Sequence, residues 1–486
     1  MSSLWPRVNR WLVWFHRWAG VALCLLVVAW FVSGAILHFI PYPSLARAEQ
    51  LAHSETIELP RVRIEPGAAL ARMPQVSDLR LVSVGGRPTY VGRTPLDASV
   101  SVAADTGEVL GPLSAAKARA VAERFAGTKA TQVAGPLAYD QWIVHQRFDR
   151  YRPLYRVRMS DTDRTDLYVS ASTGDVVQRT RFAERAWNWP GAVLHWIYFT
   201  PLRKSWSVWN QTVWWVSLLT LLSSSAGIFL GVVRLISNRM AGRPGLSPFR
   251  GWMRWHHVIG LFASVIVFGW IFSGWLSMDH GRLFSRGQPT SEQVARVRGM
   301  ALSSAAAAAP LESVQDVGPA KEVSVHAIAG RPFLAVQGDV PSASRVIWLG
   351  SGDATANSLP DRLLLAAVRE GWTSARLAAE SAGGSDDMYR LAESLPPSAR
   401  AFLAPQDGST RIYLDPLSGE ILTVMDPGRR TYAWIYYALH TLNFPGLISR
   451  PLARTSVELL LLAGGLAFGV TGIVLAVRRL RRELAH

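Results

Sequence analysis

The stretch HRWAGVALCLLVVAWFVSGAILHF, residues 16–39, decides the fold of this chain. It is long and apolar enough to cross a bilayer as one helix. It also carries His16 and His38, and an ionisable residue in a membrane helix is a candidate functional residue. The two histidines are 22 positions apart, so a helix places them about 33 Å apart on nearly one face. One helix therefore presents an imidazole at each membrane surface, unless both are merely interfacial polar residues.

Three further segments have similar length and composition, so the chain is predicted to cross the membrane four times. The predicted spans are 18–40, 209–236, 256–278 and 456–477. Basic residues gather outside them, with net charges of +3 in 1–17, +5 in 234–254 and +3 in the tail 478–486. Four spans place these segments on one side, which the positive-inside rule assigns to the cytoplasm. The total charge of +16 therefore reports topology and does not indicate nucleic-acid binding.

Two long segments, 41–185 and 279–430, then face away from the cytoplasm. Each is large enough for one or two small domains. Alternating residues predict strands, among them QWIVHQRF at 141–148, and SAAKARAVAERFAG at 114–127 predicts a short helix. The expected fold is a membrane α-helical protein with two extracytoplasmic α+β domains. The remaining segments are the cytoplasmic N-terminus 1–17, the interfacial segments 186–208 and 431–455, the cytoplasmic loop 237–255 and the cytoplasmic tail 478–486.

The two halves of the chain, about 1–240 and 241–486, resemble each other. His16 recurs 240 positions later as His256, and LHWIYF at 194–199 matches LHTLNF at 439–444. Other matches at the first offset join Gly20, Trp30, Ser33 and Gly34 to Gly260, Trp270, Ser273 and Gly274. Each half consists of a membrane span, an extracytoplasmic domain and a second span. We therefore predict a parallel internal duplication with a pseudo-two-fold axis along the membrane normal.

Seven of the 11 histidines lie at or near predicted membrane boundaries. The duplication makes His16 equivalent to His256 and His195 to His440, and a two-fold axis would bring each pair toward the bundle centre. Two imidazoles that face each other across a bundle are what bis-histidine haem ligation requires. Zinc would prefer further Cys, Asp or Glu ligands, of which the spans hold almost none. The predicted haem-iron ligands are His16, His38, His195, His256 and His440, with His257 and His280 as further candidates and the pairing left open.

The opening FHRWAGVALCLLVVAWFVSGAI, its echo WHHVIGLFASVIVFGWIFSGWL and the strands LYVSASTGDVV and IYLDPLSGEIL resemble the PepSY-associated transmembrane family. The family is similar to inner-membrane proteins of iron uptake, and some members are di-haem reductases of ferric siderophores. The resemblance implies two haem b groups and an oxidoreductase that reduces a ferric siderophore or another ferric chelate on the periplasmic side. His16, His195, His256 and His440 match family histidines.

The resemblance also implies a multi-pass protein of the bacterial inner membrane, in contact with lipid. The inner loop is short and no dinucleotide-binding motif follows a strand, so electrons would come from quinol or a separate cytoplasmic donor. Two other classes remain open. PepSY modules are associated with binding or inhibiting peptidases, so the alternative is a haem-free envelope scaffold or peptidase regulator. A transporter subunit would fit the parallel repeat, but the spans do not carry the buried charges expected at a substrate site.

Overall fold

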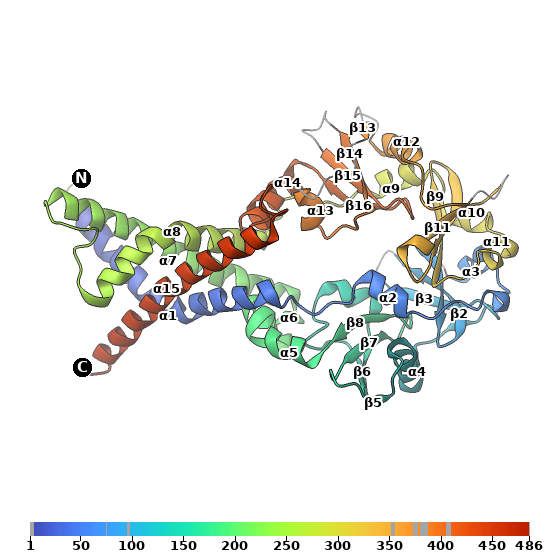
Figure 1. The fold of residues 1–486 in the computed structure, drawn as a ribbon, viewed down its shortest axis with the longest axis horizontal. Helices are drawn as coiled ribbons and strands as arrows, with labels where there is room; N and C mark the ends of the chain where they lie inside the picture. Colours follow the sequence, from blue (N-terminus) through green and yellow to red (C-terminus); the bar gives the residue numbers. More distant parts are fainter. Residues whose placement is uncertain are drawn as a thin grey trace.

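The chain is elongated, with long helices at one end and three β-sheets at the other (Figure 1). Both termini lie at the helical end, which we call the terminal end of the bundle; the opposite end of the bundle is its sheet end. The start of the predicted segment 1–17 and the last residue of the tail 478–486 lie outside the described residues. The computed structural model describes residues 4–73, 75–94, 98–350, 355–372, 378–379, 387–404 and 410–485.

Four long helices form the bundle: α1 (Leu4–Phe39), α7 (Trp206–Met240), α8 (Gly251–Ser277) and α15 (Pro451–Glu483). Each is long and apolar enough to cross a membrane, with a mean hydropathy between 2.0 and 2.5 in its most apolar part. The prediction of a multi-pass membrane protein with four spans is confirmed. The helices are longer than the predicted spans, because the flanks rich in Arg and Trp continue the helix. At 36 residues, α1 is about 54 Å long, against about 30 Å of hydrocarbon.

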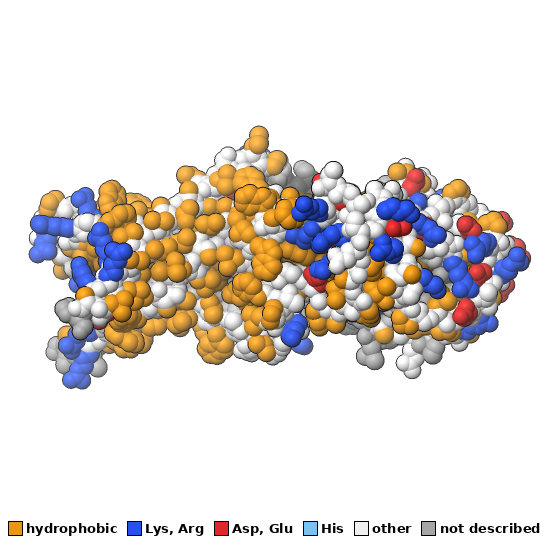
Figure 2. Space-filling view, turned by 90° about the horizontal axis from the view of Figure 1, so that it is seen from below, with side chains coloured by type: hydrophobic (Ala, Val, Ile, Leu, Met, Phe, Trp, Pro, Cys, Tyr) orange, Lys and Arg blue, Asp and Glu red, His pale blue; other side chains and the backbone are white. Residues whose placement is uncertain are grey.

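The surface of the bundle has the composition of a lipid-facing surface. Apolar side chains cover it in the space-filling view, whereas Lys and Arg gather at the terminal end and over the sheets (Figure 2). Large apolar side chains point outward from the bundle, among them Leu25, Phe262, Val265 and Leu460, which are each at least 68% exposed. Such a continuous apolar surface is unfavourable in water and favourable in a bilayer.

The helices pack in a ring in which α1 contacts α7 and α15, and α8 contacts the same two helices. Phe31, Val267 and Leu462 belong to the core of this ring. Small residues permit close approach, as membrane bundles require in the absence of a hydrophobic driving force. A Cβ atom on Gly469 of α15 would lie 2.7 Å from Val28 Cγ2 of α1.

An eight-stranded antiparallel sheet contains strands from both long segments between the spans. Its order is β12-β11-β10-β9-β1-β2-β3-β4. The join is the pairing of β1 with β9, in which Leu81 lies opposite Val323. The segments 41–185 and 279–430, predicted as two domains, therefore share one central sheet. Its strands are β1 (Asp78–Val84), β2 (Arg87–Arg93), β3 (Ser99–Ala103), β4 (Val109–Leu110), β9 (Glu322–Ile328), β10 (Arg331–Gln337), β11 (Arg345–Trp348) and β12 (Thr355–Ala356).

Helices cover one part of this sheet with a shared apolar core. Leu81 and Val323 of the sheet pack with Ala305 of α10 and Val314 of α11. The short helices of this region are α2 (Arg47–His53), η1 (Leu59–Arg61), α3 (Pro66–Leu70), α9 (Ser291–Arg298), α10 (Leu302–Ala307), α11 (Leu311–Gln315) and η4 (Pro341–Ala343).

Each long segment also contributes a four-stranded antiparallel sheet. The first has the order β5-β6-β7-β8 and packs against α4 (Ala115–Ala126). The second has the order β13-β14-β15-β16 and packs against α12 (Asp361–Gly371). The strands are β5 (Ala130–Leu137), β6 (Leu154–Met159), β7 (Asp166–Ser170), β8 (Val176–Thr180), β13 (Ala378–Ala379), β14 (Arg400–Ala404), β15 (Thr410–Leu414) and β16 (Ile421–Met425).

Local signals in the sequence identified parts of these sheets correctly and one part wrongly. The predicted helix at 114–127 is α4, with Ser114 as its N-cap and Gly127 in the left-handed conformation that ends a helix. The predicted strand QWIVHQRF is wrong, because its second half begins the 3₁₀ helix η2 (Gln146–Tyr151). The His145 ring accepts a hydrogen bond from the Arg147 backbone and thereby caps η2.

Two arms connect the sheet end of the bundle to the central sheet (Figure 1). One arm contains the β5–β8 sheet and the other the β13–β16 sheet. Each arm contains short helices and, after its last strand, one π-helical turn, a feature often found at functional sites. These elements are α5 (Phe182–Asn188), η3 (Trp189–Val193) and α6 (Thr200–Arg203) in the first arm, and α13 (Met388–Ala392), α14 (Pro427–Ala433) and η6 (Trp434–Ala438) in the second.

Candidate functional site

Four of the predicted histidines lie together as two pairs, one toward each end of the bundle. His16 of α1 and His256 of α8 form the terminal pair, with ring centroids 6.4 Å apart. His195, just after η3, and His440, just after η6, form the sheet-side pair, with ring centroids 6.2 Å apart. Ser33, which contacts His195, lies 17 residues beyond His16 on α1. The two pairs are therefore about 26 Å apart along that helix.

Serine side chains orient both rings of the sheet-side pair. His195 Nδ1 lies 2.9 Å from Ser33 Oγ, and His440 Nδ1 lies 3.0 Å from Ser273 Oγ. Each serine donates its hydroxyl proton to the carbonyl three residues earlier in its own helix, which is Trp30 for Ser33. A hydroxyl has a single proton, so each serine accepts a hydrogen bond from the ring. Both imidazoles are thus protonated at Nδ1, and Nε2 carries the lone pair that can bind a metal.

The terminal pair has the same arrangement with different partners. His16 Nδ1 lies 2.9 Å from the Ser223 carbonyl oxygen, which can only accept. His256 Nδ1 lies 2.9 Å from Thr471 Oγ1, and that hydroxyl donates its proton to the carbonyl three residues earlier. Both rings are therefore Nδ1–H tautomers as well. A hydrogen bond that fixes the tautomer and orientation of a ligating histidine is a general feature of metal sites.

Glycine lies against each of the four rings. A Cβ atom on Gly34 would lie 3.7 Å from the Cε1 atom of His195, and one on Gly274 would lie 3.4 Å from that of His440. At the terminal pair, the same atom on Gly227 would lie 2.5 Å from His16 Cε1, and on Gly472 3.9 Å from His256 Cε1. All four rings are only half-buried. A larger side chain at these positions would press on the Cε1 edge of the rings.

The spacing within each pair fits two imidazoles on opposite sides of one metal ion. A metal–nitrogen bond of about 2.0–2.1 Å, with the nitrogen about 1.1 Å from its ring centroid, gives a centroid separation of about 6.3 Å. In the described part of the chain, no three His, Cys, Asp or Glu side chains group as metal ligands. Two imidazoles would fill two positions of a metal ion, and a porphyrin is a group that supplies the others itself. The residues present therefore fit bis-histidine haem.

The other three candidate histidines belong to neither pair. His38 Nε2 lies 3.0 Å from Thr455 Oγ1, and its Nδ1 lies 2.9 Å from Glu458 Oε2, so α15 engages both ring nitrogens. His257 Nε2 donates to a carbonyl of α7 over 2.9 Å. His280 is exposed and its ring lies over Trp214, with centroids 4.6 Å apart.

The sequence alone does not predict the hydrogen-bond partners that orient the four histidine rings. Ser33 and Ser273 are equivalent residues of the repeat, and this equivalence, beside that of His195 and His440, is the signal in the sequence that points to them. Thr471 and the Ser223 carbonyl have no such signal, because a polar residue in an apolar span is equally consistent with a bond to its own helix. Aromatic rings complete the surroundings: Phe468 stacks on His256 at 4.7 Å and Tyr436 on His440 at 5.3 Å.

A protein-family model described as the PepSY-associated TM region matches residues 13–367. The match begins within α1, three residues before His16, and extends through α7 and α8 to α12. No curated protein and no solved structure matches the chain. Because the matched segment covers most of the sequence, this protein belongs to the PepSY-associated transmembrane family.

Proposed function

We propose that the protein is a haem b electron-transfer protein of the bacterial inner membrane that reduces a ferric chelate, such as a ferric siderophore, on the periplasmic side. The proposal rests on the two histidine pairs, one toward each end of the bundle. Their ring centroids lie 6.4 Å apart in the terminal pair and 6.2 Å apart in the sheet-side pair. Each ring has Nδ1 held by a partner and Nε2 directed elsewhere. One haem b would bind at each pair.

The chain's own residues would fix where and how each haem is held. His16 and His256 would ligate one iron, and His195 and His440 the other, each through Nε2. Bound haem would supply a one-electron redox centre. Ser33, with its counterparts at the other rings, keeps the proton on Nδ1 and the ring in place. Such contacts raise the basicity of the ligand and restrict its rotation. The apolar core of the bundle, which includes Phe31, Val267 and Leu462, would keep the region between the two centres poor in water.

The charge distribution supports an orientation for this path. Lys and Arg gather at the terminal end of the bundle (Figure 2), which makes that end cytoplasmic by the positive-inside rule. The sheets would then lie in the periplasm, and both termini in the cytoplasm. Electrons from quinol or a separate cytoplasmic donor would enter at the terminal pair and leave at the sheet-side pair. One electron converts Fe(III) to Fe(II), whose lower charge weakens binding to hard oxygen ligands.

The proposal includes an internal duplication. Each half of the chain contributes one histidine from a long helix to the terminal pair and one histidine after a π-helical turn to the sheet-side pair. Ser33 and Ser273 hold the rings of the sheet-side pair in the same way. A gene duplication that was followed by fusion explains why each pair takes one histidine from each half.

An absorption spectrum tests the proposal directly. The full chain, produced with added haem precursor and purified in detergent, is expected to show Soret and α bands after reduction with dithionite. Pyridine haemochrome analysis should give about two haem b groups per chain. Stopped-flow mixing of the reduced protein with a ferric siderophore should then reoxidise the α band. Purified, folded protein without Soret or α bands would overturn the redox function and favour a haem-free scaffold or peptidase regulator.

A further inference from the structure

Arg203 is a fully buried cation between aromatic rings at the sheet end of the bundle. It ends α6, and its side chain is 1% exposed. The guanidinium carbon lies 4.9 Å from the ring centroids of Tyr198 and Trp206 and 4.5 Å from that of Trp209. Aromatic faces attract a guanidinium through its flat surfaces. The N–H groups point outward in the plane of the guanidinium, where a ring face cannot accept their hydrogen bonds.

Two of the three guanidinium nitrogens of Arg203 have no acceptor among the described residues. Nε and Nη2 of Arg203 are buried and have no hydrogen-bond partner, and no described carboxylate forms an ion pair with the group. The nearby acids have other partners. Asp140 binds Arg156 at 2.7 Å, and Asp149 binds Arg152 at 2.8 Å. Burial of an unpaired charge is strongly unfavourable, so a buried guanidinium normally has an anionic partner.

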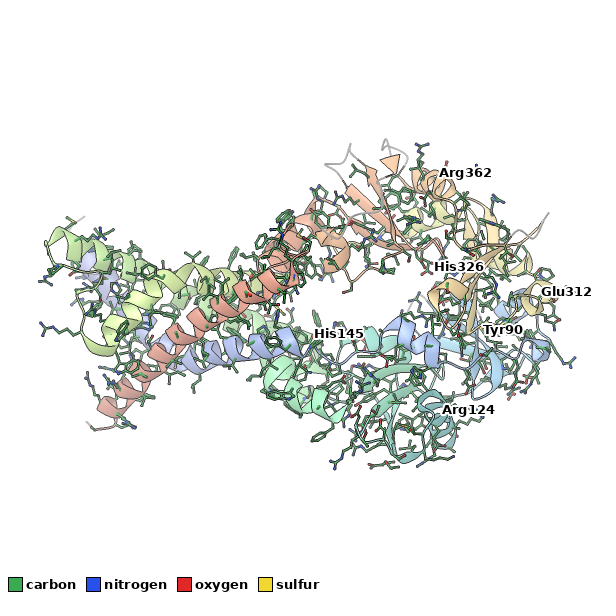
Figure 3. All side chains as sticks on the ribbon, viewed as in Figure 1. Tyr90, Arg124, His145, Glu312, His326 and Arg362 are labelled. Atoms are coloured by element: carbon green, nitrogen blue, oxygen red, sulfur yellow. The ribbon has the colours of Figure 1, made fainter. Side chains whose placement is uncertain are left out.

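Two further nitrogen-bearing side chains belong to the segment that adjoins this aromatic cluster. His145 and Arg147 lie at the start of η2, and Val144 beside them packs on Tyr198 and Trp209. Partial burial, together with the charges of Arg147 and Arg203, lowers the pKa of the His145 imidazole to about 4. Figure 3 shows His145 where the bundle meets the β5–β8 arm. The neighbourhood therefore carries two arginine charges and a neutral imidazole.

We propose that Arg203 and Arg147 bind a carboxylate group at this junction. Guanidinium and carboxylate form paired, charge-assisted hydrogen bonds, and the free N–H edges of Arg203 are suited to them. The site adjoins the sheet-side histidines, because Tyr198 packs on Trp196, the residue after His195, at 5.2 Å. Trp209 also donates to the Trp196 carbonyl over 2.9 Å.

A carboxylate could reach this site from two sources. One is a propionate of a haem held by His195 and His440, and the other is a carboxylate-bearing ferric chelate in solution. The site itself follows from the unpaired guanidinium, whereas the identity of the anion rests on the proposed function. The test must therefore separate the binding of a dissolved anion from the retention of haem.

Gallium(III) citrate is a suitable probe, because it carries carboxylates and does not accept electrons under the conditions of the assay. It is titrated into the full chain in detergent, with tryptophan fluorescence as the signal, since Trp206 and Trp209 face the site. Haem content is measured on the same samples. The variants are Arg203→Gln and Arg147→Gln, and the control is Arg331→Gln. Arg331 is an exposed arginine that stacks on Trp348 at 4.4 Å in the central sheet.

Loss of gallium citrate affinity by about tenfold or more in both site variants, but not in the control, supports a site for a dissolved chelate. Loss of haem in the site variants, with no citrate binding by the parent chain, supports a propionate site. The proposal is overturned if both site variants match the control in citrate affinity and haem content. Arg147 is exposed, so its variant keeps the test valid if Arg203→Gln does not fold. A parent chain that binds citrate and holds no haem would refute the proposed function alone.

Discussion

His195 and Ser33 meet across the junction between the first arm and α1, with 2.9 Å between Nδ1 and Oγ. The contact joins residues 162 positions apart and orients the ring by the position of a membrane helix. Because the serine proton goes to its own helix, the ring must donate. The geometry of the sheet-side pair is therefore set by the bundle and not by the arms alone.

Replacement of Ser33 by Ala should weaken haem binding at the sheet-side pair. The ring would lose the group that fixes its tautomer and orientation, and such losses reduce metal affinity about 10- to 100-fold. Haem titration of the depleted protein, followed at the α band, measures the effect. Ser264→Ala is the matched control, since Ser264 donates to the carbonyl three residues earlier in α8 and has no hydrogen bond to a histidine among the described residues. Equal affinities for the two variants would contradict the role of Ser33.

Single alanine substitutions of the paired histidines should each remove one haem of the two. His16→Ala and His256→Ala should lose the same centre, and His195→Ala and His440→Ala the other, because each proposed haem would be held by both histidines of a pair. The His16/His256 double variant should then lose no more haem than either single variant. Pyridine haemochrome analysis and the low-temperature α band, which separates the two centres, measure these outcomes.

The same series tests His38. Both of its ring nitrogens are engaged by Thr455 and Glu458, so His38→Ala should retain both haems. His53→Ala provides a baseline, since His53 is exposed in α2. Loss of one haem from the His38 variant, at a level similar to His195→Ala, would restore His38 to the ligand set.

The four spans could be predicted from the sequence, because a run of about 20 apolar residues has few alternatives to a membrane helix. The equivalence of His16 with His256 and of His195 with His440 could also be predicted from the sequence, since the repeat aligns them. The pairing of β1 with β9 could not be predicted. Alternation identifies a strand but not its partner, and here the partner lies about 240 residues away.

Arg203 shows a second limit of the sequence. An arginine beside Pro201 and Lys204 in a boundary segment looks like an ordinary basic flank. Its burial depends on Tyr198, which is close in sequence, and on Trp209 in the next helix, which turns back over it. Whether a charge is paired is a property of the folded neighbourhood, and no local pattern reports it.

Acid should weaken the join between the two halves of the outer region through Glu322. Burial raises the pKa of Glu322, but the charges of Arg47 and Arg80, at 2.7 and 3.1 Å, outweigh burial and lower it to about 2. A carboxyl whose pKa is lower in the folded than in the unfolded state stabilises the protein at pH values above its unfolded pKa. This stabilisation is lost as the pH falls toward the folded pKa. The loss should extend from pH 4.5 to about 2 and amount to about 3 kcal/mol.

Glu322→Gln should therefore lower the thermal midpoint at neutral pH, and its difference from the parent should shrink as the pH falls below 4.5. Glu312→Gln, at an exposed position in α11, should leave the midpoint unchanged across the range. His326 adds a separate loss between pH 6.5 and about 4, since burial lowers its pKa. The charge of Glu322 raises the pKa of His326, so Glu322→Gln enlarges this loss, and the Glu322 effect itself is read below pH 4. A constant difference between Glu322→Gln and the parent at all pH values would contradict the assignment.

Replacement of Gly227 by Ala should displace the His16 ring. The new Cβ atom would lie 2.5 Å from Cε1, inside the contact distance, and Gly227 and His16 are both held in long helices. The ring must rotate, which breaks its bond to the Ser223 carbonyl and moves Nε2 away from His256. Haem at the terminal pair should bind about tenfold or more weakly, while the sheet-side centre stays filled.

Gly464→Ala is the matched control for this substitution, because a Cβ atom there meets nothing within 4 Å in the described part of the chain. Both changes replace a helix glycine by alanine, which by itself favours the helix by about 1 kcal/mol. The thermal midpoint of the haem-free protein should therefore rise or stay constant for Gly464→Ala. Its haem spectrum should match that of the parent. Full occupancy of the terminal haem in Gly227→Ala would contradict this prediction. The orientation of the His16 ring would then not matter for haem binding, and His16 would not be a ligand in the orientation described.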